Sequence, residues 1–242
     1  MFIEAPGLPL YRRIQAELRA RIERGELAPG TQVDTELSLM TRFGVSRATV
    51  RQALAGLVAE GRLEIRRGLG TYVRPPAMEH ALGGFYTFSR EIERHGMMPG
   101  TRVLGLAVVP AEGGVAAALG VPVGSPVVAL SRIRLADDDP LVSETSYLPA
   151  ALFPGLERVD FTRARLYDTL VAQYGVRPVR AREVFDPVLL TTVEADVLGG
   201  RRGDPALRVE RTAYDKDGII IEYCRSTLRG DRYRYSVELR EL

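Results

Sequence analysis

The stretch Gly44-Val-Ser-Arg-Ala-Thr-Val-Arg-Gln-Ala-Leu54 decides the fold of the N-terminal part of the chain. Its glycine predicts the end of one helix, and Ser46 can begin the next helix by accepting a hydrogen bond from a backbone N–H. Apolar residues then recur every three to four positions and form the buried side of this second helix. Arg47 and Arg51 are four residues apart, so they share one face. The sequence therefore predicts two helices joined by a very tight turn.

Further elements surround this turn. From Leu10 to Ile22, apolar residues recur every four positions, which is typical of an amphipathic helix. The helix before the turn is expected to begin at Thr35, whose hydroxyl can cap it. After the third helix, the two-residue alternation of strands surrounds Arg66-Arg-Gly-Leu-Gly70, so a basic hairpin, or wing, is expected. This order predicts a winged helix-turn-helix over residues 1–73.

The start of the third helix carries the chemistry of DNA recognition. In a helix-turn-helix, the first residues of the second of the two paired helices face the edges of DNA bases. Arg47 and Arg51 can each make a bidentate pair with guanine or bind a phosphate, and Ser46 and Thr49 are short donors suited to phosphate oxygens. An isolated helix with two arginines is more often only a solvated face, but the order of helices, turn and basic hairpin favours DNA binding.

The wing and the charge distribution point the same way. Arg66 and Arg67 at the tip of the wing could reach an adjacent groove, with Gly68 letting the backbone approach closely. Up to Val73, the chain has 11 arginines and 8 acidic residues, a net charge of +3, whereas the remainder has 22 basic and 23 acidic residues, a net charge of −1. The positive excess is local to the predicted winged helix, as expected for a polyanion partner.

Length and composition exclude several classes of protein. The chain has 242 residues, 45% hydrophobic and 26% charged, which fits two folded domains rather than a disordered or fibrous protein. The most apolar stretch, from Leu104 to Gly124, is interrupted by prolines, glycines and a glutamate, so no membrane span is expected. No secretory signal is recognisable and Cys224 is alone, so we expect a cytoplasmic protein without an internal disulfide.

A second domain is expected after a proline-containing segment. Arg74-Pro-Pro-Ala-Met78 predicts a semi-rigid linker, which we assign to residues 74–82, and residues 83–242 are predicted to form an α+β domain with a mainly antiparallel sheet. Helices are expected over residues 87–95, 115–119, 165–174 and 192–198. Strands are expected near residues 102–109, 126–135, 141–148, 179–188, 206–214, 219–228 and 233–239. Asp137-Asp-Asp-Pro140 and Lys216-Asp-Gly218 are predicted to be hairpin turns.

Two features of this domain predict a pocket for an anion. Arg132 and Arg134 are two residues apart on a predicted strand, so both side chains leave the same face and can converge on one ligand. Ser89 lies in the first turn of a predicted helix, whose free N–H groups attract phosphate or carboxylate. The alternative is that both arginines face solvent and pair with Asp137 or Asp139.

The N-terminal motifs resemble those of a known family. Gly44-Val-Ser-Arg-Ala-Thr-Val-Arg-Gln-Ala-Leu54, Glu60-Gly-Arg-Leu63 and Gly68-Leu-Gly-Thr-Tyr-Val73 are similar to the winged-helix domain of GntR-type bacterial regulators, over nearly all of residues 8–73. The resemblance implies DNA contacts from Thr35, Ser46, Arg47, Thr49, Arg51, Arg66, Arg67 and Gly68. One departure is Leu37, which stands where family members commonly have an arginine that touches DNA. The resemblance therefore leaves the operator sequence open.

From about residue 83 onward, the chain resembles the UTRA effector domain of the HutC subgroup of these regulators, which is related in fold to chorismate lyase. The similar segments include Arg132-Ile-Arg-Leu135, Glu144-Thr-Ser-Tyr-Leu-Pro149 and Leu166-Tyr-Asp-Thr-Leu170. In family members that bind phosphorylated sugars, the positions that line the site match Ser89, Arg132, Arg134, Glu144, Tyr167 and Glu222. Arg165 stands where several of these proteins have a serine, so it either adds a third charge to the pocket or points away from it.

The sequence thus predicts a ligand-responsive transcription regulator, most simply a repressor, that binds a palindromic operator as a homodimer. Its effector is expected to be a small anionic metabolite such as a sugar phosphate, and no cofactor or metal is expected. An enzyme with lyase-like activity is the alternative, suggested only by the fold, and an architectural DNA-binding protein without a ligand is a third possibility. Neither histidine lies in a metal or hydrolase motif, and Glu91 and Glu93 near His95 are interpreted as a solvated helix face.

Overall fold

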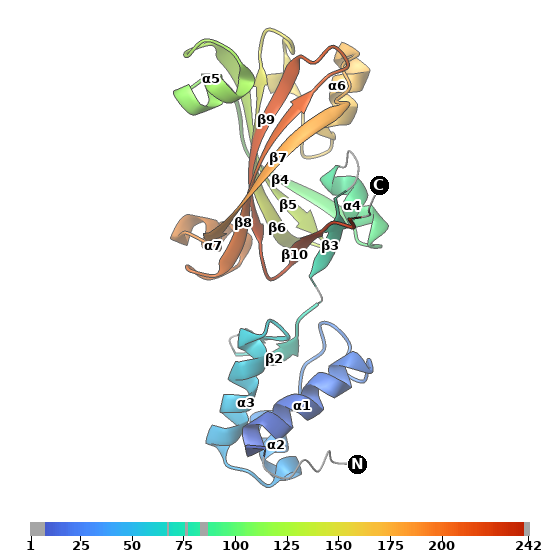
Figure 1. Cartoon of the computed structure of the whole chain (residues 1–242), viewed down its shortest axis with the longest axis vertical. Coiled ribbons are helices and arrows are strands. Elements are labelled where there is room, and N and C mark those ends of the chain that lie inside the picture. Colours follow the sequence, from blue (N-terminus) through green and yellow to red (C-terminus); the bar gives the residue numbers. More distant parts are fainter. Residues whose placement is uncertain (1–7, 67, 76, 83–86, 240–242) are drawn as a thin grey trace. The chain divides into compact units, whose positions relative to one another are not determined.

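The computed structural model describes residues 8–66, 68–75, 77–82 and 87–239. The chain divides into two compact units, Met1–Pro76 and Ala77–Leu242, shown in Figure 1. Within the described residues, no helix is both long enough and apolar enough to cross a membrane.

The first unit consists of three helices and a two-stranded hairpin. Its elements are α1 (Leu10–Glu23), α2 (Glu36–Phe43), α3 (Arg47–Ala59), β1 (Leu63–Arg66) and β2 (Gly70–Val73). The predicted caps are confirmed, because the Thr35 hydroxyl accepts a hydrogen bond from Ser38 N at 3.2 Å and the Ser46 hydroxyl accepts one from Thr49 N at 3.3 Å. Gly44 ends α2 with a φ of 63°, a conformation that glycine adopts at little cost.

A single apolar core holds these elements together. It consists of residues from all three helices and from both strands of the hairpin, and among its members are Ile14, Leu18, Leu39, Val50, Leu54, Leu57, Leu63 and Val73. Leu63 and Val73 are paired across the antiparallel hairpin, and both belong to this core. The wing therefore packs against α3. The start of α3 lies outside this core, and the side chains of Ser46 and Arg47 remain exposed.

The second unit is built on a six-stranded antiparallel sheet with the strand order β4-β5-β6-β9-β8-β7. These strands are β4 (Pro99–Pro110), β5 (Pro126–Ala136), β6 (Asp139–Pro149), β7 (Arg180–Leu189), β8 (Pro205–Tyr214) and β9 (Ile220–Arg229). The predicted turns are present: Asp137 and Asp138 join β5 to β6 with φ values of 47° and 65°, and Gly218 in the turn before β9 has a φ of 80°. Two consecutive positive φ values match the twist of an antiparallel hairpin.

Helices cover both faces of this sheet. They are α4 (Phe88–Arg94), α5 (Gly113–Leu119), α6 (Leu166–Tyr174) and α7 (Thr192–Leu198), with a short 3₁₀ helix η1 (Leu156–Arg158). Figure 1 shows α4 and α6 on one side of the sheet and α5 and α7 on the other. The α6 side packs Leu166 and Leu170 against Val128 and Leu130 of β5. Because side chains alternate along a strand, the residues that follow in β5 with the same parity also face α4 and α6.

Residues 74–82, predicted as a linker, include a strand of the second unit. Here β3 (Met78–Ala81) pairs in parallel with β10 (Tyr233–Ser236), and Met78 N donates a hydrogen bond to Arg232 O at 2.8 Å. Prolines just before β3 indicate a stiff chain but carry no information about a partner strand more than 150 residues away.

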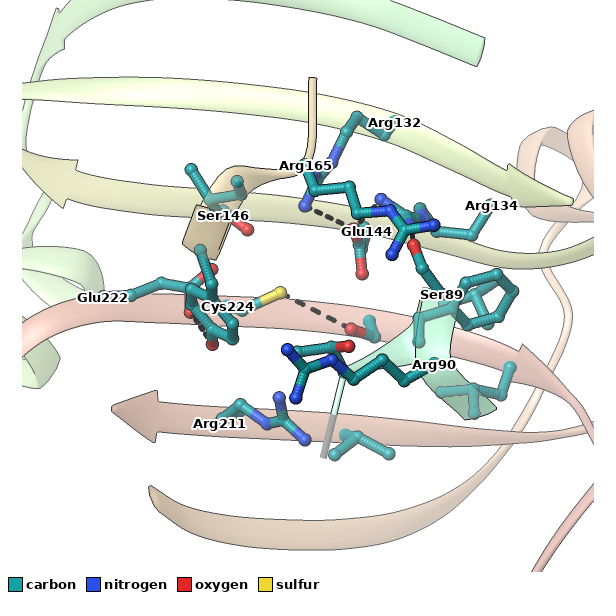
Figure 2. Close-up of a pocket in the computed structure, with 18 of the residues that line it drawn as sticks. Ser89, Arg90, Arg132, Arg134, Glu144, Ser146, Arg165, Arg211, Glu222 and Cys224 are labelled. Atoms are coloured by element: carbon teal, nitrogen blue, oxygen red, sulfur yellow. Dashed lines mark hydrogen bonds and ion pairs between the residues drawn. The ribbon is translucent and has the colours of Figure 1, made fainter. Parts of the chain in front are cut away.

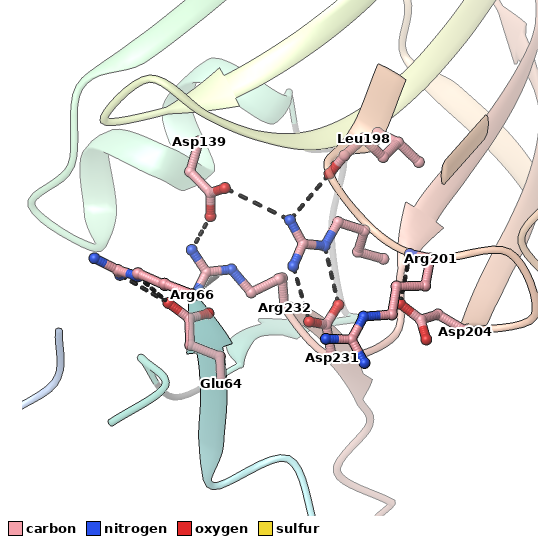
Figure 3. Close-up of polar contacts among 9 residues, drawn as sticks. Glu64, Arg66, Asp139, Leu198, Arg201, Asp204, Asp231 and Arg232 are labelled. Carbon is pink, nitrogen blue, oxygen red and sulfur yellow. Dashed lines mark hydrogen bonds and ion pairs between the residues drawn. The ribbon is translucent and has the colours of Figure 1, made fainter. Parts of the chain in front are cut away.

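A network of ion pairs formed by two arginines lies at the end of the sheet beside β10 (Figure 3). Arg229 Nη1 donates to the carbonyl of Leu198 at 3.0 Å, and Arg229 pairs with Asp231 at 2.9 Å and with Asp139 at 3.5 Å. Arg232 forms a further ion pair with Asp139. This network ties the end of α7 and the start of β6 to the turn between β9 and β10.

The expectation that Glu91 belongs to a solvated helix face is wrong. Its side chain is buried, and its Oε2 lies 3.2 Å from Nδ1 of His80 in β3. His80 also packs against the rings of Tyr233 and Tyr235 in β10. The position of Glu91 in its helix predicted an exposed side chain. The residue that covers Glu91 belongs to β3, and the sequence did not predict that β3 packs against α4.

Candidate functional site

Two arginines at the start of α3 share one carboxylate. Arg47 Nε donates a hydrogen bond to Oε2 of Glu36 at 2.8 Å, and Arg51 Nε lies 3.4 Å from Oε1 of the same residue. The arginine side chains are 70% and 71% exposed, while that of Glu36 is 33% exposed. The structure therefore brings Arg47 and Arg51 together on an open surface, as their spacing predicts.

The hydroxyl-bearing residues predicted to contact DNA lie at the ends of the same helices. Ser46 and Thr35 cap α3 and α2, and the hydroxyl of Ser46 lies 3.0 Å from that of Thr49. Ser46 and Thr35 are exposed and Thr49 is half-buried. Leu37, at the position where family members commonly have an arginine, is 70% exposed although it is apolar.

In the wing, Arg66 forms an ion pair with Glu64 at 2.7 Å and lies over the ring of Tyr72, with 4.3 Å between its guanidinium carbon and the ring centroid. Gly68 has a φ of 74°, which explains why glycine stands at the tip of the hairpin. Arg67 lies outside the described residues.

The second unit contains a pocket between the sheet and the first turns of α4 and α6 (Figure 2). It holds about 880 Å³ of empty space, a volume that includes its open mouth. All seven predicted ligand-binding residues line it, namely Ser89, Arg132, Arg134, Glu144, Arg165, Tyr167 and Glu222. The alternation of side chains along β5, β6 and β9 brings four of them to one face of the sheet.

One end of the pocket is cationic. Arg132 Nη2 lies 2.6 Å from Glu144 Oε1, Arg134 Nη1 lies 3.9 Å from the same oxygen, and Arg134 Nη2 donates to the Ser89 hydroxyl at 2.8 Å. Arg132 and Arg134 are only 5% and 8% exposed, so the alternative in which they face solvent and pair with Asp137 or Asp139 is excluded.

The pKa values at this end reflect burial and shared charge. Burial lowers the pKa of Arg134 to about 10, against the opposing attraction of Glu144. Burial by itself would raise the pKa of Glu144, but Arg132 and Arg134 outweigh this effect and hold that pKa below its ordinary value. Glu144 is therefore ionised at neutral pH and carries one negative charge against two positive charges.

The opposite end offers hydrogen-bond acceptors. The Tyr167 hydroxyl donates to Oε2 of Glu222, which is buried. Burial raises the pKa of Tyr167 well above its usual value, and the nearby Glu222 carboxylate raises it further, so the hydroxyl keeps its proton. Arg165 lines the pocket and forms an ion pair with Glu93 of α4; both side chains are nearly half exposed.

The prediction missed several further residues of the pocket. Arg211 of β8 pairs with Glu183 of β7 at 2.7 Å, and Cys224 of β9 stands opposite Arg211. Burial, then Glu144 and Glu222, raise the pKa of Cys224 to about 12. A signal for Arg211 was present, because it interrupts the inward-facing apolar series of Val209 and Ala213. Within the part of the chain that the structure describes, no cluster of three or more histidine, cysteine or acidic residues could hold a metal ion.

Comparison with known families accounts for both units. Residues 10–73 match the model of the bacterial regulatory proteins of the gntR family, and residues 94–234 match the UTRA domain. The chain belongs to the GntR family. This GntR-family protein carries a UTRA domain as its second unit, and its family implies DNA binding by the first unit and binding of a small molecule by the second.

Named relatives share both units with this GntR-family chain. It is 36% identical to the transcriptional repressor NagR of Bacillus subtilis, over 94% of this chain and 93% of that protein. It is 31% identical to MngR of Escherichia coli, the repressor of a mannosyl-D-glycerate transport and metabolism system, over 95% of each chain. The crystal structure of PhnF from Mycobacterium smegmatis is similar with a TM-score of 0.66 and 32% identity, over 94% of this chain and 99% of that one. NagR, MngR and PhnF are all named as repressors.

Proposed function

We propose that this GntR-family protein is a transcriptional repressor that binds a palindromic operator as a homodimer and responds to a sugar phosphate. The observation that carries the proposal is a pair of buried guanidinium groups, Arg132 and Arg134, that share the single carboxylate of Glu144 inside a pocket. The chain combines this pocket with a helix-turn-helix unit, and the relatives NagR and MngR are named as repressors.

An anionic group on the effector fits the cationic end of the pocket. Two guanidinium groups and one carboxylate leave one uncompensated positive charge in a buried place, where desolvation makes such a charge costly. Arg134 has a lowered pKa for this reason. The buried Nε atoms of Arg132 and Arg134 have no hydrogen-bond partner among the described residues. A phosphate would supply both negative charge and acceptor oxygens.

The rest of the effector is expected to carry hydroxyl groups. Glu222 accepts a hydrogen bond from the Tyr167 hydroxyl and retains lone pairs that can accept hydrogen bonds from a sugar. The pocket also has apolar walls, including Val142, Leu166 and Leu228. A phosphorylated sugar matches this combination of a charged end, an acceptor end and apolar sides.

Two copies of the chain are expected to act together on DNA. A single α3 and wing contact only a few base pairs, and helix-turn-helix proteins commonly join two half-sites through a two-fold dimer. Effector binding would change the fit of the two reading helices to the half-sites. Such coupling is typically ~1–3 kcal/mol and reciprocal, so operator DNA should weaken effector binding by the same factor.

The effector is tested by isothermal titration calorimetry of the full chain with hexose 6-phosphates, the corresponding free hexoses and inorganic phosphate. We expect binding of at least one sugar phosphate that exceeds binding of its free sugar and of phosphate alone. Binding of the free sugar with equal affinity would contradict the role of the arginines. The repressor function is tested separately, by gel-shift assays with a duplex that the protein selects from a random pool, with and without the effector, and by sedimentation of the free chain.

A further inference from the structure

The contact between Glu36 and the two arginines of α3 uses one particular atom of each guanidinium group. Glu36 is the first residue of α2, and its two carboxylate oxygens contact Nε of Arg47 and Nε of Arg51, at 2.8 and 3.4 Å. An arginine bound through Nε still presents its terminal Nη1 and Nη2 groups. These two groups are the ones that can donate in parallel to O6 and N7 of guanine.

We infer that Glu36 is a positioning residue for DNA specificity: it holds Arg47 and Arg51 so that their terminal nitrogens are presented together to base edges. The inference rests on the proposed role of α3 in reading the operator. Both arginines are long and about 70% exposed, so without a partner each would sample many rotamers. A carboxylate anchored at the start of a capped helix removes part of that freedom before DNA arrives, which reduces the entropy lost on binding.

The same carboxylate affects non-specific binding in the opposite direction. Affinity for any duplex depends mainly on the number of positive charges that neutralise phosphates. Glu36 reduces the local charge of the α3 start by one, so it weakens attachment to DNA that lacks the right bases. Glu36 therefore increases discrimination in two ways, since it prepares contacts that only the operator satisfies and weakens contacts that every sequence satisfies.

The test compares Glu36→Gln with a matched control, Glu60→Gln, in the full chain. Glu60 lies at the C-terminal end of α3 and pairs with Arg19 at 2.8 Å, so its substitution also removes one negative charge and one exposed ion pair from this unit. Affinities are measured at one fixed salt concentration for a duplex selected by the wild-type protein from random sequence and for a scrambled duplex. Thermal unfolding confirms that both variants are folded.

Both substitutions should raise affinity for the scrambled duplex, because each removes a negative charge. Only Glu36→Gln should lower the ratio of operator to scrambled affinity, by ~10-fold or more, since one misplaced bidentate arginine forfeits about that much discrimination. Single-base substitutions in the operator should show that Glu36→Gln relaxes the same base positions that Arg47→Ala and Arg51→Ala relax.

An unchanged affinity ratio in Glu36→Gln, or relaxation at other base positions only, would show that the carboxylate merely masks charge and would overturn the inference. Failure of the proposed function gives a different result: the wild-type chain would then select no sequence from the pool. That outcome would also overturn the inference, but it would be seen in the wild-type protein and not in the variant.

Discussion

Each of the two units contains a carboxylate that is shared by two arginines, but the two groups lie in different environments. At the start of α3, Arg47 and Arg51 share Glu36 on a surface where the arginine side chains are about 70% exposed. In the pocket, Arg132 and Arg134 share Glu144, and the arginine side chains are 5% and 8% exposed. Each group has two positive charges and one negative charge within a few ångströms.

Exposure decides what the shared carboxylate contributes. Water screens the charges of the α3 start, so an exposed pair adds only ~0–1 kcal/mol to stability and its effect lies in where the guanidinium groups point. In the pocket, the two guanidinium groups are buried, and removal of the carboxylate leaves both cations without compensation. The same arrangement is therefore expected to control specificity in the first unit and stability together with ligand binding in the second.

The largest expected effect comes from Glu144→Gln. This change should destabilise the second unit by ~3–5 kcal/mol, because it breaks a buried ion pair and leaves Arg132 and Arg134 without a negative charge. Urea denaturation followed by near-ultraviolet circular dichroism of the tyrosines measures it, since the chain contains no tryptophan. Glu36→Gln is the matched control and should cost less than ~1 kcal/mol. Equal losses in the two variants would show that burial does not distinguish the two regions.

Arg134→Met should separate ligand binding from stability. The variant keeps the Arg132–Glu144 pair and removes the cation whose pKa burial has lowered to about 10, so its stability should stay within ~1 kcal/mol of wild type. Affinity for an anionic effector should fall by ~10- to 100-fold, the value of a charge-assisted hydrogen bond. Calorimetry and urea denaturation measure the two quantities. A large loss of stability with unchanged affinity would assign Arg134 to the fold rather than to the ligand.

Arg47→Ala should affect operator affinity alone. We expect a loss of ~1–3 kcal/mol of binding free energy to the selected duplex, the value of a bidentate base contact. Stability should change by no more than ~0.5 kcal/mol, because the side chain is exposed and lies outside the core of the first unit. Arg19→Ala removes the same charge elsewhere in the unit and serves as the control in gel-shift titrations. Equal losses of operator affinity in the two variants would show that Arg47 contributes only its charge.

The two sites also differ in how far the sequence predicts them. The α3 site is contained in one short stretch, so helical periodicity and caps place Ser46, Arg47 and Arg51 without knowledge of the rest of the fold. Thr35 and the wing follow from the same local signals. Glu36 escaped notice as a partner of both arginines because that contact depends on how α2 crosses α3, which periodicity does not determine.

The pocket draws its residues from many strands and two helices, and their assembly depends on strand order and register. Alternation along β5 predicts that Arg132 and Arg134 share a face, and the family resemblance adds Glu144 and Glu222. The break in the apolar series of β8 marks Arg211, but its pairing with Glu183 in the pocket requires knowledge that β8 lies between β9 and β7, which no local pattern provides. The parallel pairing of β3 with β10 escaped prediction for the same reason.

The smallest expected effect concerns Cys224, the buried thiol beside the charges of the pocket. Its pKa is raised to about 12 by burial and by the negative charges of Glu144 and Glu222, so the folded state favours the protonated thiol. The stability that this preference contributes is fully present below the unfolded-state pKa of ~8.5 and is lost as pH rises toward the folded-state value. The stability of the wild type relative to Cys224→Ala should therefore be unchanged from pH 7 to 8. By pH 10 the wild type should have lost ~1–2 kcal/mol of stability relative to the variant, because ionisation of the thiol stabilises the unfolded state.

Urea denaturation of both proteins at each pH measures this difference as a loss of wild-type stability against the variant. A pH-independent difference in stability between Cys224→Ala and wild type would mean that water reaches the thiol. The contrast between the screened charges of the α3 start and the unscreened charges of the pocket would then be smaller than the exposed fractions of their side chains indicate.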